Sequence, residues 1–273
     1  MDSRERNGQG VTGVNRRVLK ETTHSGQIAR IILATPKANI LDRPTMLEFT
    51  DSLRALATHT DLKAIIVSSE GPHFSFGASI EEHLPGQIRE TLALLRSLLE
   101  ELVMAPAPTI AAVRGQCLGG GFELALACDL IIAEESAQFG LPEIKLGVFP
   151  PAGAALLPVR VGASRSAELI ITGKSWTAES ALAAGLVQRL APSGELAVWI
   201  DNWIEAEFLP RSATAMRFAA QAARRPLLHC LKAELPDLER VYLDDLMQHS
   251  DAIEGIQAFL EKRSPHWAAS SPQ

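Results

Sequence analysis

Short apolar runs alternate with stretches of helical periodicity along the first part of the chain. Continuous apolar runs at residues 28–33 and 62–67 predict buried strands. Between them, apolar residues from position 46 to position 56 recur at the spacing of one helix face. This order predicts a β-α-β unit, which is the building block of α/β proteins.

The same rhythm continues through the middle of the chain. Apolar positions at residues 92–103 have helical spacing, and the prolines that follow end this helix before a short strand at residues 109–113. A further strand is predicted at residues 130–133. Residues 139–158 are rich in Gly and Pro, and we expect them to form a loop. The fold class predicted is therefore α/β.

The second half of the chain is predicted to be mostly helical. Helical patterns bounded by Ser, Thr or Gly occur at residues 164–172, 177–184 and 196–208, and everything after residue 210 has helical character. We divide the chain into three parts: a flexible leader at residues 1–13, a core at residues 14–210, and a C-terminal helical region at residues 211–273.

Composition narrows the class of protein. The 273 residues are 47% hydrophobic, enough for a large core, but no apolar run approaches the ~20 residues of a membrane span. The three cysteines have no metal-ligand spacing and favour reduced thiols, so we expect a cytoplasmic protein without a metal site. A net charge of −6 and scarce aromatic residues argue against nucleic acid as a partner.

A run of three glycines, Gly119 to Gly121, precedes a helix-favouring stretch at residues 122–128. The first turn of a helix carries unpaired amides, which suit an oxygen with negative charge. The run has neither the lysine of a P-loop nor the glycine spacing of a dinucleotide fingerprint, so a nucleotide phosphate is not its expected ligand. A tight turn without a ligand is the alternative interpretation.

Two glutamates accompany the glycines. Glu123 lies about one turn into the predicted helix, and Glu143 follows in the predicted loop after the next strand. Two carboxyl groups buried together repel when both are charged, so the pKa of at least one rises and the pair can donate and accept a proton near neutral pH. The alternative is that Glu123 complements the helix dipole while Glu143 is a solvated loop residue.

A third element, residues 73–82, contains a Gly-Ala turn directly after a predicted strand. Together with the glycine run and both acids, it resembles the crotonase family, also called the enoyl-CoA hydratase/isomerase superfamily. The resemblance extends from about residue 18 to the C-terminus and lies in these segments: residues 36–39, 74–80, 114–123, 129–133, 138–147 and 181–187. It implies a crotonase-like spiral of ββα units, with a C-terminal helical region that mediates trimerisation, often as a dimer of trimers.

The resemblance also implies site residues. By it, the amides of Ala78 and Gly120 form an oxyanion hole for the thioester oxygen of an acyl-CoA. Glu123 and Glu143 both match the acids that hold the water, deprotonate it and supply the proton to carbon. We assign Glu123 as the water-orienting base and Glu143 as the main proton donor, and the reverse division stays open. Retention of both acids favours a hydratase, that is, a hydro-lyase. No cofactor is implied, because coenzyme A is part of the substrate.

Five further positions match segments that contact the substrate or coenzyme A in this family. They are Lys37, Ala38, Phe76, Ser79 and Ile80. Lys37 has an equally good alternative interpretation as a solvated surface charge.

The chain departs from common hydratases of the family in two places. Ser79 and Glu81 stand where Asp and often Lys occur, and the usual Pro-Gly-x-Gly-Gly loop is replaced by residues 149–154, which contain two prolines. Several segments resemble the subgroup that hydrates cyclohexa-1,5-diene-1-carbonyl-CoA in anaerobic aromatic degradation. That implies a ring pocket, and its expected walls are Phe76, Phe149 and Pro151.

Two other functions remain open at this stage. A double-bond isomerase or a straight-chain enoyl-CoA hydratase would use the same scaffold, and a non-catalytic CoA-binding or assembly protein would need neither acid. Two loop histidines, His73 and His83, are left out of the mechanism, because loop histidines are commonly structural or solvated.

Overall fold

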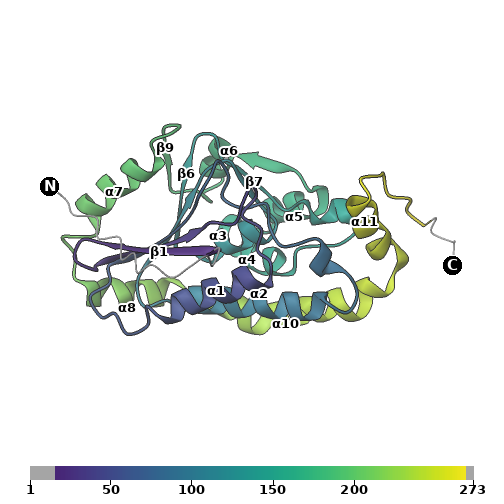
Figure 1. Ribbon diagram of the computed structural model, residues 1–273, viewed down its shortest axis with the longest axis horizontal. Helices are drawn as coiled ribbons and strands as arrows, with labels where there is room; N and C mark the ends of the chain where they lie inside the picture. The colour runs from purple at the N-terminus through teal and green to yellow at the C-terminus, as the bar shows by residue number, and fades with distance from the viewer. Residues whose placement is uncertain (1–15, 269–273) are drawn as a thin grey trace.

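Six strands form the larger of two sheets in the computed structural model, which describes residues 16–268. The spatial order is β1-β2-β3-β4-β6-β9, with β1 antiparallel to β2 and every other pair parallel (Figure 1). The strands are β1 (Val18–Thr23), β2 (Ile28–Leu33), β3 (Ala64–Ser69), β4 (Thr109–Val113), β6 (Leu130–Glu134) and β9 (Arg189–Ala191). The predicted leader at residues 1–13 lies outside the described residues.

A repeated ββα unit links this sheet to a smaller one of order β5-β7-β8. Strand β4 is followed at once by β5 (Gln116–Leu118) and α3 (Gly120–Ala127), and β6 is followed by β7 (Gln138–Gly140) and then α4 (Pro151–Val161). The last strand of the smaller sheet is β8 (Ser175–Thr177). Each unit thus crosses from the larger sheet to the smaller one before its helix, which gives the spiral that the sequence resemblance implied.

The larger sheet is buried on both faces, as its apolar strands require. On one face, Ile66 and Ile132 pack against α7 (Leu196–Glu207). On the other face, Ile65 and Ile131 belong to the main core. Because side chains alternate along a strand, adjacent residues point to opposite faces of the sheet.

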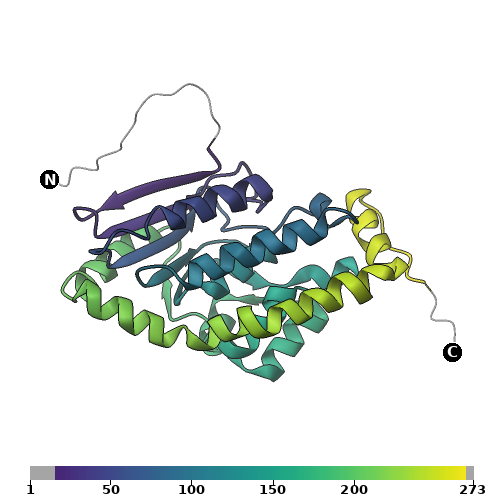
Figure 2. The same ribbon diagram turned by 90° about the horizontal axis from the view of Figure 1, so that it is seen from below.

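Helices cover the main core below the sheets. Figure 2 shows α1 and α2 running beside the helical run of the C-terminal region. The remaining helices are α1 (Arg43–Arg54), α2 (Ile88–Val103), α5 (Ala163–Thr172), α6 (Ala178–Ala183), α8 (Ala213–Ala223), α9 (Arg225–His229), α10 (Leu235–Arg240) and α11 (Ser250–Leu260). Within residues 16–268, no helix is both long enough and apolar enough to span a bilayer.

A buried ion pair fixes the C-terminal region to the larger sheet. Arg224, at the end of α8, donates bonds of 2.8 Å and 2.6 Å to the two carboxylate oxygens of Asp129, which precedes β6. It also donates to the carbonyl oxygens of Ala105 and Ala107, each at 2.6 Å. Every edge of the guanidinium is therefore used to join the two parts of the chain.

The prediction of a loop at residues 139–158 is wrong. The segment contains the end of β7, a 3-10 helix at Pro142–Leu146 and most of α4. Proline is favoured at the first position of a helix, where its missing N–H costs nothing, and Pro151 occupies that position in α4. Leu156 and Leu157 then bury the helix against the core, so the prolines mark a helix start rather than a loop.

Candidate active site

The glycine run forms a turn from β5 into α3. Gly119 has a φ of 49°, a left-handed conformation that disfavours side chains, and α3 begins at the next residue. The amide of Gly119 donates to the carbonyl of Gly140 at 2.9 Å, which ties the turn to β7. The prediction that the glycines begin a helix is confirmed, and Gly120 is the first residue of that helix.

The Gly-Ala turn is held beside the glycine run by the backbone. Ser75 accepts a bond of 3.0 Å from the Leu118 amide, and the Ser75 hydroxyl accepts one of 3.1 Å from the Gly77 amide. Gly77 has a φ of 102°, and a Cβ there would lie 2.9 Å from the Leu118 carbonyl oxygen. Only glycine allows the two backbones to approach this closely.

The amides of Ala78 and Gly120 meet at this contact. A Cβ on Gly120 would lie 3.2 Å from the Ala78 nitrogen, so the two amides are neighbours across the two turns. Within residues 16–268, neither amide donates to an acceptor of the protein. The structure therefore brings together the two predicted oxyanion-hole residues, and it leaves both donors available to a ligand.

Glu123 lies in the first turn of α3, and its side chain is almost fully buried. Its Oε1 accepts a hydrogen bond of 2.6 Å from the Gly153 amide in the first turn of α4. Burial raises the pKa of Glu123 to about 7, and the amides of Gly153 and Ala152 oppose the rise by stabilising the carboxylate. Glu123 is poised to exchange a proton at neutral pH.

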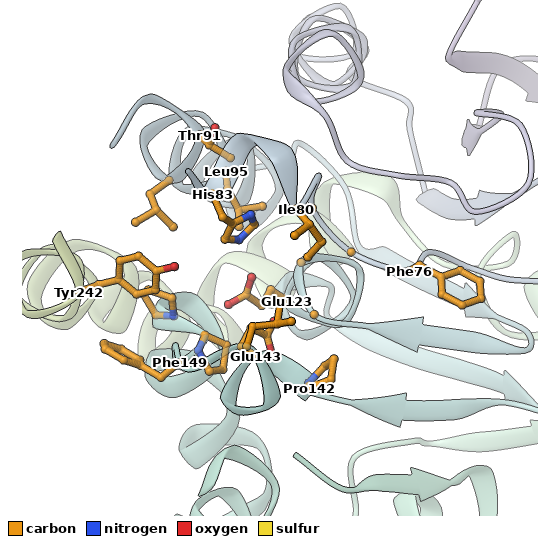
Figure 3. Close-up of a pocket in the computed structure, with 18 residues that line it drawn as sticks. Phe76, Ile80, His83, Thr91, Leu95, Glu123, Pro142, Glu143, Phe149 and Tyr242 are labelled. Atoms are coloured by element: carbon orange, nitrogen blue, oxygen red, sulfur yellow. The ribbon is translucent and has the colours of Figure 1, made fainter. Parts of the chain in front are cut away.

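Glu143 lies in the 3-10 helix that follows β7. Burial, and secondarily the charge of Glu123, raise the pKa of Glu143 to about 8. Its Oε2 is buried with no partner among the described residues, while a Cβ on Gly119 would lie 2.8 Å from its Oε1. Figure 3 shows both carboxyl groups directed into one pocket, so the structure brings the two predicted acids together.

Comparison with known proteins decides the family. The model of the family described as enoyl-CoA hydratase/isomerase matches residues 23–270. The chain belongs to the enoyl-CoA hydratase/isomerase family. The predictions of a crotonase fold and of an enzyme of the enoyl-CoA hydratase class are confirmed at this level.

Similar members of the enoyl-CoA hydratase/isomerase family include characterised and solved proteins. The chain is 42% identical to cyclohexa-1,5-dienecarbonyl-CoA hydratase of Thauera aromatica, over 89% of this chain and 93% of that one. It is 36% identical to 2,3-dehydroadipyl-CoA hydratase of Escherichia coli strain K12, over 86% and 94%. A crystal structure of an enoyl-CoA hydratase from Mycobacterium avium subsp. paratuberculosis K-10 superposes with a TM-score of 0.82 at 27% identity, covering 93% and 99%.

The candidate site consists of two adjoining pockets, an inner one and an outer one. The inner pocket holds Glu123 and Glu143 and is otherwise mainly apolar; its walls include Leu92, Leu95 and Phe149. The outer pocket opens beside it, and the two share the following residues: Phe76, Ala78, Ile80, Pro142 and Leu146. A ligand can therefore extend from the acids past the paired amides to the surface.

Most of the predicted substrate contacts line the outer pocket. Ala38, Ser79 and Ile80 are among its walls. Lys37 is exposed in the preceding turn and does not line either pocket, so its contact with coenzyme A stays a prediction. Ser79 donates a bond of 2.8 Å to Glu81, which pairs the two residues that depart from common hydratases.

All three expected wall residues line the inner pocket, and their contact with a ring stays a prediction. Phe149 and Pro151 lie there with Pro151 fixed as the first residue of α4. Phe76 lines both pockets. Its ring is 41% exposed, packs edge-on against His73 at 5.0 Å and points away from the carboxyl pair in Figure 3.

Two inner-pocket residues were not selected from the sequence. His83 and Tyr242 both line the inner pocket, whereas His73 has a structural contact in which its Nδ1 accepts from the Gln116 amide at 3.2 Å. Tyr242 is the only tyrosine of the chain and stands between Val241 and Leu243, and this is the one signal that the sequence offers. Tyr242 lies far from both acids along the chain, so the sequence did not predict that it lines the same pocket.

Proposed function

We propose that this protein adds water to a conjugated enoyl-CoA or dienoyl-CoA thioester, and that its substrate is cyclohexa-1,5-diene-1-carbonyl-CoA. The observation that carries the proposal is the buried pair of carboxyl groups, Glu123 and Glu143, beside two free backbone amides. One ionised and one protonated carboxyl group near neutral pH suit the addition of a proton and a hydroxide to a double bond.

The paired amides would act on the thioester. The Ala78 and Gly120 N–H groups donate to its carbonyl oxygen, and each is worth about 3 kcal/mol when negative charge develops there. Electron density drawn to this oxygen makes the conjugated double bond electrophilic. The negative charge of the enolate formed by addition rests on the oxygen that the amides hold.

The two acids would divide the proton transfers. Ionised Glu123 takes a proton from water while the hydroxide oxygen bonds to the electrophilic carbon. Protonated Glu143 gives its proton to the enolate carbon, the double bond is consumed, and one water has been added. Transfer of the proton from Glu123 back to Glu143 then restores the starting state. The Gly153 amide stabilises the Glu123 carboxylate, whereas Oε2 of Glu143 is buried without a partner among the described residues, and this difference supports the assignment.

The pocket supports a cyclic acyl group. Leu92, Leu95, Phe149 and Pro151 provide apolar walls around the acids. The outer pocket, with a cavity volume of about 640 Å³, leaves room for the coenzyme A arm. The relative from Thauera aromatica named as a cyclohexa-1,5-dienecarbonyl-CoA hydratase supports the same ring.

We also propose a homotrimer or a dimer of trimers. Large apolar side chains are exposed in the second half of the chain: Ile171 at 69%, Val198 at 64%, Phe218 at 64% and Phe259 at 55%. Contact between subunits would remove such side chains from water. Light scattering on the purified protein tests the assembly, and a monomeric mass at micromolar concentration contradicts it.

The hydratase proposal is tested by the mass of the acyl-CoA. We expect cyclohexa-1,5-diene-1-carbonyl-CoA to gain one water, and to react faster than crotonyl-CoA. Glu123→Gln and Glu143→Gln should each reduce the rate by at least 100-fold, because one proton transfer is lost. Glu135→Gln, at an exposed position, is the matched control.

Three outcomes would count against the proposal. Full activity in both site variants contradicts the roles of the acids. Faster hydration of crotonyl-CoA favours a straight-chain hydratase, and a double-bond shift without a mass change favours an isomerase. Failure to turn over any acyl-CoA favours a non-catalytic binding protein.

A further inference from the structure

Tyr242 contributes a buried hydroxyl group to the inner pocket. It lies in a π-helical turn, Val241–Asp245, directly after α10. The ring packs edge-on against Phe149 with a centroid distance of 5.5 Å, which fixes its direction. Figure 3 shows the hydroxyl pointing into the pocket toward the carboxyl pair. The Tyr242 hydroxyl has no hydrogen-bond partner among the described residues.

An unpartnered buried hydroxyl has a cost. Burying a donor without a partner destabilises the folded protein, so such groups call for a structural or functional explanation. Burial, together with the charges of Glu143 and Glu123, raises the pKa of Tyr242 well above its usual value. The phenol therefore stays protonated and can donate a hydrogen bond to a ligand.

His83 offers the complementary group. Its Nδ1 lies 2.7 Å from the Ser79 carbonyl oxygen, and because a carbonyl only accepts, Nδ1 must carry the proton. Burial lowers the pKa of His83, which keeps the ring neutral. Nε2 is then a bare acceptor on a side chain that lines the same pocket as Tyr242.

The third polar side chain in this part of the pocket is already engaged. The Thr91 hydroxyl lies 3.3 Å from the Gln87 carbonyl and 3.4 Å from the Glu82 carbonyl, to which it can donate. Apart from the two acids, Tyr242 and His83 are thus the polar side chains of this pocket with an unused donor and an unused acceptor. A hydroxyl satisfies both of them, whereas a keto oxygen could use only Tyr242 and a methylene neither.

We propose that the Tyr242 hydroxyl and the His83 Nε2 form a hydroxyl-binding subsite, which holds the hydroxyl group of the hydroxyacyl-CoA product. Tyr242 donates to the product oxygen, and the product hydroxyl donates to His83. The subsite rests on the proposed function, because hydration creates the hydroxyl that it binds. Both residues are positioning residues, since neither is needed to transfer a proton.

The test compares ligands with and without the hydroxyl. Titration calorimetry measures the affinity for hydroxycyclohexene-carbonyl-CoA and for cyclohexene-carbonyl-CoA in the full-length Glu143→Gln protein, where turnover is suppressed. Tyr242→Phe should weaken binding of the hydroxylated ligand about tenfold and leave the other within about twofold. A purely structural role of Tyr242 would weaken both ligands alike.

Two further variants sharpen the comparison. His83→Phe removes the acceptor and should act like Tyr242→Phe, while His83→Gln keeps an acceptor oxygen and should retain part of the preference. Leu95→Val is the matched control, because it enlarges the same pocket without removing a polar atom and without touching the Phe149 contact that orients Tyr242. It should change the affinities for both ligands by the same factor.

The outcomes separate this proposal from the one on which it rests. If Tyr242→Phe changes neither affinity, or both equally, the subsite is wrong and the hydratase proposal stands. If the ring ligands do not bind, 3-hydroxybutyryl-CoA and butyryl-CoA take their place with the same expected difference. If no CoA ester binds to the parent protein, both proposals are wrong.

Discussion

The Gly153 amide donates a hydrogen bond of 2.6 Å to Oε1 of Glu123. This contact places one carboxyl group at the N-terminus of α4, where first-turn amides and the helix dipole favour negative charge. In Glu143 the buried Oε2 lacks a partner among the described residues, and the backbone hydrogen bond that lowers its pKa comes from its own residue instead of a helix N-terminus. The two acids therefore differ in environment, and the difference favours ionisation of Glu123 first.

Removal of the Gly153 amide proton should make Glu123 harder to ionise. Gly153 is the third residue of α4 and its N–H makes no intrahelical bond, so Gly153→Pro removes the donor to Glu123. The pKa of Glu123 should then rise, and the acid limb of the kcat/KM profile should move to higher pH. Gly153→Ala adds a Cβ at the same place but keeps the N–H. An equal shift in both variants would show that crowding against Leu141 is responsible instead.

The pH profile of hydration should be bell-shaped. Activity requires ionised Glu123 and protonated Glu143, so kcat/KM should rise with pH through about 7 and fall through about 8. The two limbs belong to the pair, because each charge affects the other. Initial rates from about pH 5 to about pH 10 measure the profile. A rate independent of pH over this range would contradict the assignment.

A methyl group on Gly120 should block the candidate oxyanion hole. Its Cβ would lie 3.2 Å from the Ala78 nitrogen, closer than a Cβ ordinarily approaches, and would crowd one of the two amides proposed to bind the thioester oxygen. Alanine favours helix over glycine, so Gly120→Ala should fold normally and lose roughly 100-fold or more in kcat. Thermal unfolding and steady-state rates measure the two effects. Ser164→Ala, at an exposed position in α5, controls for a methyl-sized change elsewhere.

Stability should depend on pH through Glu143. Its pKa in the folded state, about 8, lies above the unfolded value, so the stabilising contribution is present at low pH and lost as pH rises through 8. The unfolding free energy of the wild type should fall between about pH 5 and about pH 9. In Glu143→Gln this fall should be smaller by on the order of 2–4 kcal/mol. Urea unfolding at both pH values tests this. Glu135→Gln should keep the wild-type dependence.

Arg224 should be essential for stability without taking part in the chemistry. Arg224→Met leaves the Asp129 carboxylate and two backbone carbonyl oxygens without their donor, and breaking such a buried pair costs about 3–5 kcal/mol. Arg211→Met is the matched control, because its bond to Glu207 is exposed and worth less than about 1 kcal/mol. Equal losses of unfolding free energy would contradict the account.

Local sequence patterns predicted the elements that one sequence feature determines, such as an apolar run or a glycine run. The apolar run at residues 28–33 coincides with β2, and the glycine run begins α3 as expected. The helix α4 was missed because prolines were interpreted as loop residues, although Pro151 takes the one helix position that suits it. Short strands such as β8 have exposed or half-exposed residues, so no apolar run marked them.

The sequence predicted only those residues of the candidate site that lie in a recognisable sequence motif. Ala78 and Gly120 lie in glycine turns whose sequence is itself the signal, and Glu123 follows Gly120 by one helical turn. Glu143 lies beyond β7, and its own Gly-Leu-Pro-Glu segment belongs to the motif. Tyr242 has no local motif, and it reaches the pocket only because α10 and the turn after it pack against the core. The direction of the Phe76 ring depends on its contact with His73, which no local pattern encodes.

The C-terminal region contributes residues to both the inner and the outer pocket. Tyr242 lies in the inner pocket, while Phe259 and Arg263, from the end of α11 and beyond, line the outer pocket. The paired amides and the two acids all come from the core. The C-terminal stretch thus supplies part of the walls of both pockets but none of the four candidate reacting groups, so substitutions in it can reshape these walls while the acids and the paired amides stay unchanged.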